Sequence, residues 1–197
     1  MARGSTRSER QKETISALTG AARERFAMVG YAATSMDELC ASVGLTRGAL
    51  YHNFGGKKGL FEAVVEQIDG EIATRLDQVW SSHQDPWEAF RAACRAYLAL
   101  ALEPEVQRVL FRDAPAVLGQ RLREIDQRSS LASTIEALQA LQIDGRIKSA
   151  EPEAVARLLA GAMVDAALWI AQSERPEEAL VKAQTGLDAL LEGLLTP

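Results

Sequence analysis

The sequence predicts an all-α protein with an N-terminal three-helix helix-turn-helix head and a larger antiparallel helical body, about nine helices in total. First, Ala and Leu dominate the composition and aromatic residues make up 6%, which favours helix over strand. Second, apolar residues recur at spacings of three and four, and no strand-like alternation appears. We place the head, with a basic N-terminal arm, at residues 1–56 and the body at residues 57–197.

The first two helices of the head are marked by an apolar stripe and a capping motif. The stripe runs over residues 15–29 and stops at Gly30, a residue typical of helix C-termini. Ser35 stands three residues before Glu38, which is the capping-box pattern for the start of a second helix.

The third and fourth helices follow from the turn residues around them. Gly44 permits the tight turn after the second helix, and Thr46 can cap a short third helix that ends near Asn53. The pair Gly55-Gly56 then breaks the chain, and Lys57 begins a long fourth helix that continues into the body.

The body is expected to be a series of helices separated by Pro and Gly. Prolines at positions 86, 152 and 176 suit the first turn of a helix, and those at 104 and 115 are expected to interrupt one. The predicted body helices cover about 86–102, 106–111, 117–141, 152–170 and 176–194.

Charge is distributed unevenly between the two halves. Residues 1–60 hold nine Lys and Arg against five Asp and Glu, a net charge of +4. The remainder holds 13 basic and 22 acidic residues, a net charge of −9. A basic head on an acidic body suggests that contact with a polyanion is confined to the head.

Several classes of protein are disfavoured by what the sequence lacks. No apolar run approaches the roughly 18–20 residues of a membrane span, and the polar N-terminus has no signal-peptide core, so we expect a cytoplasmic protein. Cys40 and Cys94 sit in apolar helical patterns and are expected to be buried free thiols. The cysteines and the two histidines form no metal-ligand spacing, so we expect neither a metal nor a cofactor.

The segment from Thr34 to Lys58 carries the strongest functional signal. Its second short helix would present a polar face that fits the roughly 12 Å major groove of DNA, N-terminal end first. We expect arginine to bind guanine or phosphate, glycine to allow close backbone approach, and the helix starts to hold phosphates. The candidate DNA-binding residues are Thr34, Ser35, Thr46, Arg47, Gly48, Tyr51, His52, Asn53 and Lys57.

This segment resembles the DNA-binding head of the TetR family over about residues 10–68. The matching elements are a Gly-aromatic pair at the end of the first helix, a Thr/Ser before the second, Val-Gly followed by Thr, and Leu-Tyr-X-X-Phe with a Lys three residues later. The sequence departs from the usual family pattern at Gly55, Gly56 and Lys58.

The resemblance implies a homodimer built on the last two long helices and a cavity for a small, largely apolar effector in each body. Aromatic and Met side chains of the body can line such a cavity, although hydrophobic core is the simpler interpretation of each. The candidate ligand-binding residues are Trp87, Phe90, Tyr97, Phe111, Met163 and Trp169. The candidate dimer residues are Leu159, Met163, Ala166, Leu187, Leu190, Leu191 and Leu194, for which core packing within one chain is the alternative.

The function predicted from these features is a ligand-responsive repressor that binds a palindromic operator. An enzyme is disfavoured because no catalytic constellation or phosphate-binding loop is visible. Two alternatives stay open: a helical adaptor whose head binds protein, and a TetR-like activator without a ligand.

Overall fold

The computed structural model describes residues 7–126 and 131–196, so residues 1–6 of the arm predicted over residues 1–8 lie outside them. The described residues form helices joined by short turns and one isolated β-bridge, so the predicted all-α class is confirmed. In chain order the segments are α1 (Arg7–Ala33), α2 (Met36–Ser42), α3 (Arg47–Phe54), α4 (Lys57–Ser81), α5 (Pro86–Ala99), η1 (Leu100–Leu102), α6 (Pro104–Val106), η2 (Gln107–Asp113), α7 (Ala114–Leu118), α8 (Gln120–Asp126), α9 (Ala132–Ile143), α10 (Pro152–Gln172) and α11 (Pro176–Glu192).

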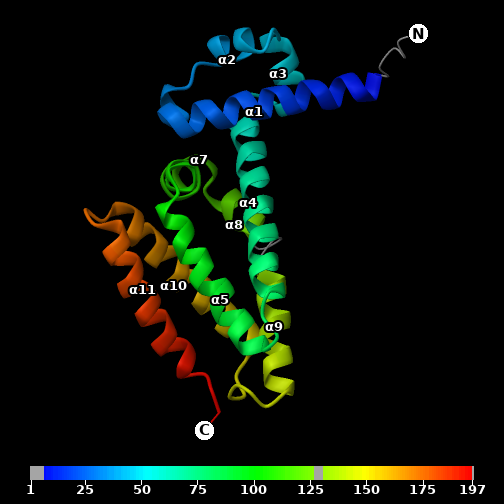
Figure 1. The fold of residues 1–197 in the computed structure, drawn as a ribbon. Coiled ribbons are helices and arrows are strands. Elements are labelled where there is room, and N and C mark those ends of the chain that lie inside the picture. The colour runs from blue at the N-terminus through cyan, green and yellow to red at the C-terminus, as the bar shows by residue number, and fades with distance from the viewer. Residues whose placement is uncertain (1–6, 127–130, 197) are drawn as a thin grey trace.

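Helix α4 joins the head to the body. Its upper part packs against α1 and α3, and its remaining length packs against α5, α7 and α8 (Figure 1). At about 1.5 Å per residue, its 25 residues extend over roughly 37 Å. The predicted continuous connection between the halves is therefore present as one straight element.

Three aromatic rings hold α1 on the start of α4. The ring of Phe61 lies 5.0 Å from Phe26 and 5.0 Å from Tyr31, in both cases edge to face. Phe26 and Phe61 are completely buried. Such pairs stabilise a core beyond the area that they bury, so the head rests on a rigid joint.

The predicted helix over residues 117–141 is wrong. The chain is helical from Ala114 to Leu118, but Gly119 has φ +56° and ψ −120°, which no helix contains. A new helix, α8, starts at Gln120, and α9 starts at Ala132. The expected interruption at Asp113-Ala114-Pro115 is also wrong, because the π-helical segment η2 leads directly into α7.

Helix α10 overturns the expectation that no segment has the length and apolarity of a membrane span. Within its 21 residues, an 18-residue window reaches a mean hydropathy of 1.6, and 17% of that window is buried within the chain. Length and composition alone are weak evidence for a span, because helices that pack in soluble proteins meet the same criteria. The helix nevertheless leaves an apolar face uncovered by its own chain.

Candidate DNA-binding surface and body cavity

Helix α3 is fixed at both ends and anchored by one buried side chain. The Thr46 hydroxyl accepts a hydrogen bond from the Ala49 backbone N–H at 3.2 Å, as its predicted capping role requires. Gly55 ends the helix with φ +71°, a left-handed conformation that glycine adopts without strain. Leu50 is completely buried, which turns the opposite side of the helix to solvent.

Five of the predicted DNA-binding residues form this exposed side, which we call the α3 face: Thr46, Arg47, Gly48, Tyr51 and His52. Tyr51 is 55% exposed. Its ring lies over Gly56, where an added Cβ would stand 3.3 Å from the ring edge. The α3 face thus presents the guanidinium of Arg47, the phenol of Tyr51 and the imidazole of His52, with Gly48 among them.

Two residues near the α3 face are engaged within the head. The Arg47 Nε lies 3.2 Å from Asp37 at the start of α2. The Asn53 side chain donates to the Ala49 carbonyl at 2.8 Å and accepts from Gln11 of α1 at 3.3 Å. Asn53 therefore helps to hold α3 on α1, whereas Arg47 keeps its side chain exposed beside a carboxylate.

Thr34 and Ser35 differ in what they can offer a phosphate. The Ser35 hydroxyl accepts from the Glu38 N–H at 3.4 Å and caps α2 as predicted. Thr34 is only 3% exposed, and its hydroxyl donates to the Gly30 carbonyl at 2.7 Å. The Thr34 hydroxyl is thus used to close the end of α1.

Lys57 lies where α4 meets the end of α1. Its ammonium donates to the Ala32 carbonyl at 3.2 Å and sits 4.6 Å from the centre of the Tyr31 ring. Partial burial lowers the pKa of Lys57. The N-terminus of α4 has no side-chain cap, so its first N–H groups add to the positive potential beside this ammonium.

Sequence reasoning missed a glycine that sets the distance between α3 and α4. A Cβ at Gly59 would stand 1.9 Å from the Phe54 carbonyl oxygen, so a larger residue would push the two helices apart. A glycine inside a helical pattern is the signal that points to such a close approach.

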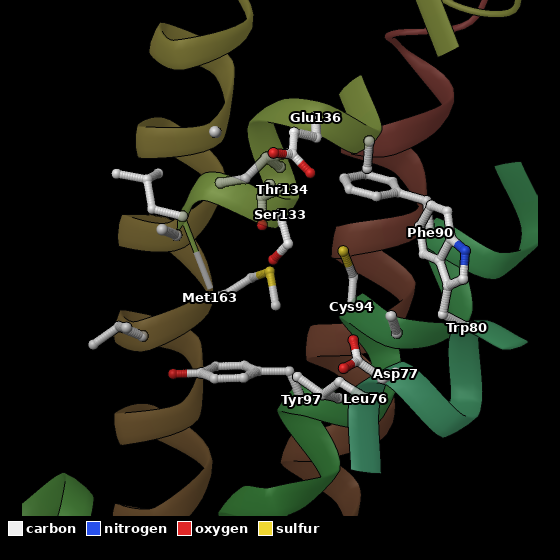
Figure 2. Close-up of a pocket in the computed structure, with 17 residues that line it drawn as sticks. Leu76, Asp77, Trp80, Phe90, Cys94, Tyr97, Ser133, Thr134, Glu136 and Met163 are labelled. Atoms are coloured by element: carbon white, nitrogen blue, oxygen red, sulfur yellow. The ribbon is translucent and has the colours of Figure 1, made fainter. Parts of the chain in front are cut away.

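The body contains a cavity of about 420 Å³ bordered by α4, α5, α9 and α10 (Figure 2). Three predicted ligand-binding residues line it: Phe90, Tyr97 and Met163. Three do not: Trp87 and Phe111 are buried elsewhere in the core, and Trp169 is 49% exposed.

Most of the cavity wall was not predicted. It includes Leu76, Asp77 and Trp80 near the end of α4, and Thr134 and Glu136 of α9. Periodicity identifies α4 and α9 as helices but does not say which of their faces meet. Nothing in the sequence therefore indicated that these residues line a cavity.

Arg108 and Asp113 bind the end of α1. Arg108 donates to the Val29 carbonyl at 2.8 Å, and Asp113 accepts from the Tyr31 N–H at 2.7 Å. Gly30 lies between these bonds with φ +82°. The body therefore holds the last turn of α1 through backbone groups.

The predicted dimer residues fall into four environments. Leu187 and Leu191 are buried within the single chain, and Leu159 lines the cavity together with Met163. Leu190 is 63% exposed. Ala166 and Leu194 are partly buried.

A three-helix head with a capped, exposed recognition helix, carried on a helical body, defines the class of helix-turn-helix DNA-binding proteins. The model of bacterial regulatory proteins of the tetR family matches residues 18–64, and that of the tetracyclin repressor-like C-terminal domain matches residues 87–194. The chain therefore belongs to the TetR family of transcriptional regulators, with a DNA-binding N-terminal domain.

Similar proteins support this family over the full length. A TetR-family regulator of Pectobacterium atrosepticum has 46% identity and a TM-score of 0.88, with 98% of this chain and 99% of that chain covered. The transposon Tn10 TetC protein of Escherichia coli is 26% identical over 78% of each chain. The nucleoid occlusion factor SlmA of Vibrio campbellii is 28% identical over 61% of each. RolR, solved with resorcinol, shares the fold at 19% identity and a TM-score of 0.75, with 95% of this chain and 90% of that chain covered.

Proposed function

We propose that this protein is a repressor that binds a near-palindromic operator as a homodimer and leaves it when a small molecule enters the body cavity. The observation that carries the proposal is α4, which has Lys57 at its head end and lines the cavity with Leu76 and Trp80 at its other end. One rigid helix thus connects the two places where DNA and a ligand would act.

The mechanism follows from thermodynamic linkage between the two sites. A ligand releases DNA only if it binds better to the conformation that cannot bind the operator. A tilt of α4 around the cavity would move the head through the Phe61 contacts and change the spacing of the two α3 faces. Because half-sites lie roughly 34–36 Å apart on one side of DNA, a small change in that spacing is enough to lose one of them.

The homodimer is proposed on the uncovered side of α10 and α11. Leu158 and Val164 of α10 are 75% and 39% exposed, and Val181 and Leu190 of α11 are 64% and 63% exposed. An apolar patch of this kind on a soluble protein marks an interaction site. A second copy related by a two-fold axis would cover both helices and match the symmetry of a palindrome.

The DNA-binding part is tested by Arg47→Ala and Lys57→Ala. We expect Arg47→Ala to weaken operator binding and relax base preference, because this side chain lies on the α3 face. We expect Lys57→Ala to weaken binding to all sequences alike and to lower the salt slope by about one, because it removes a phosphate contact.

Fluorescence anisotropy with operator and scrambled duplexes at several salt concentrations measures both effects. Lys148→Ala, at the end of the body remote from the head, is the matched control and should leave both properties unchanged. Equal loss of specificity in the two head variants would contradict the division of roles. Absence of DNA binding at low salt would favour a protein-binding adaptor.

A further inference from the structure

The charge of the cavity wall is one-sided. Among its lining residues in the described part of the chain, Asp77 and Glu136 are acidic, and none is Lys, Arg or His. The remaining wall is mainly aromatic, aliphatic or sulfur-containing, with the hydroxyls of Ser133 and Thr134 added from α9. A ligand in this cavity would meet negative charge on an apolar background.

The two carboxylates face the cavity from different helices. Figure 2 shows Asp77 on α4 and Glu136 on α9 with their oxygens directed toward the space between Phe90, Cys94 and Met163. Both residues are in contact with solvent. They therefore border the open side of the cavity, where a charged ligand keeps part of its hydration as it enters.

Neither carboxylate has a cationic partner among the residues that the structure describes. Within the described residues, neither Asp77 nor Glu136 forms an ion pair or hydrogen bond. Two other acidic residues of α4 form ion pairs: Glu62 lies 2.5 Å from Arg121, and Glu71 lies 2.6 Å from Arg23. The acidic residue of α4 that faces the cavity is thus unpaired within the described part of the chain.

The aromatic walls suit the same type of ligand. The ring centres of Trp80 and Phe90 lie 6.5 Å apart and their planes are 83° from each other, which is an edge-to-face arrangement. The ring that presents its edge therefore keeps both of its faces uncovered by the other ring. Tyr97 extends across the cavity on the opposite side from Phe90 (Figure 2). A cation within about 6 Å of such a ring face is attracted by its quadrupole. Cys94 contributes a neutral thiol to the wall, because burial raises its pKa to about 12.

We infer that the cavity selects ligands that combine a positive charge with an aromatic or apolar body, and rejects anions of the same shape. This inference rests on the proposed role of the cavity as an effector site and names the chemical class of effector. The volume of about 420 Å³ falls within the range of roughly 300–1,000 Å³ typical of small-molecule sites.

The test compares three probes that share a phenylbutyl body and differ in the head group, by isothermal titration calorimetry on the full-length protein. They are phenylbutyl-trimethylammonium, its uncharged isostere with carbon in place of nitrogen, and phenylpentanoate. We expect the cation to bind about tenfold more tightly than the neutral isostere, and the anion to bind least. Asp77→Asn and Glu136→Gln should each reduce the preference for the cation by roughly threefold.

Asp144→Asn removes one exposed carboxylate just beyond the C-terminus of α9, outside the cavity, and should leave the preference unchanged. Equal or tighter binding of the neutral isostere or the anion to the unmodified protein would overturn the charge selectivity while supporting a small-molecule site. Failure of all three probes to bind would overturn both the inference and the proposed effector role of the cavity. A preference for the cation that survives when Asp77→Asn and Glu136→Gln are combined in one protein would also overturn the assignment to these two carboxylates.

Discussion

Gly30 lies at the contact between head and body, with φ +82° and ψ 171°. This region of backbone conformation is accessible almost only to glycine. An added Cβ would stand 2.1 Å from Nη2 of Arg108, the nitrogen that donates to the Val29 carbonyl. Gly30 thus combines a backbone conformation that favours glycine with a close contact to Arg108 of the body.

Gly30→Ala is expected to destabilise the protein by about 1–3 kcal/mol through this backbone strain. The Arg108 side chain can move away, but it then loses its hydrogen bond to Val29. Urea unfolding followed by circular dichroism gives the change in the free energy of unfolding.

Gly20→Ala is the matched control, because Gly20 lies within α1 and has no atom within 4 Å of an added Cβ. Alanine there should raise stability by roughly 0.5–1 kcal/mol, as it does in helix interiors. Equal effects of the two substitutions would show that Gly30 has no special role.

At the scale of helices, Arg23 ties three elements together. From α1 it donates to Glu71 of α4 at 2.6 and 2.8 Å, and to Glu105 of α6 at 2.7 and 2.8 Å. These bonds lower the pKa of Glu71 and raise that of Arg23. The guanidinium therefore stays charged at every pH at which the carboxylates titrate.

The lowered pKa of Glu71 makes this contact sensitive to acid. Its stabilising contribution is complete above the ordinary carboxyl value of 4.5 and is lost as the pH falls through the lowered pKa of the folded state. We expect Arg23→Gln to lower stability at neutral pH by a modest amount, because Glu71 is half exposed, and to flatten the acid-side decline.

Urea midpoints measured between about pH 7 and about pH 3 test this expectation. Arg157→Gln serves as the control, since Arg157 pairs with Glu153 within the exposed side of one helix. A decline with acid that is as steep in Arg23→Gln as in the unmodified protein would contradict the role of Arg23.

At the scale of the whole molecule, an apolar surface on α10 and α11 is left uncovered by the chain itself. Leu158 and Leu190 are among its most exposed residues, at 75% and 63%. Aggregation or pairing follows when such surfaces meet, and a symmetric pair is the closed solution.

Leu158→Glu and Leu190→Glu are expected to convert a dimer to monomers, because each places a charge in an interface that two copies share. Light scattering after size-exclusion chromatography measures the mass. Ile143→Glu tests a residue that is more exposed, at 85%, but lies at the end of α9; it should leave the mass unchanged. A monomeric unmodified protein, or a dimer in both leucine variants, would contradict the proposed interface.

Sequence alone determined the helical class, the caps at Ser35 and Thr46, and the polar α3 face. These depend on helical periodicity and on hydrogen bonds between residues three apart, so neighbours along the chain are sufficient to predict them. The family motif in the head is likewise local and continuous.

Only the tertiary structure decided what distant residues do for each other. The break at Gly119 divided a stretch with continuous helical periodicity, and Arg108 and Asp113 proved to bind the backbone of α1 about 80 residues away. Asp77 and Glu136 share one cavity although they are distant in sequence. The physical reason is that periodicity fixes which face of a helix is apolar, whereas the packing of whole helices fixes which faces meet.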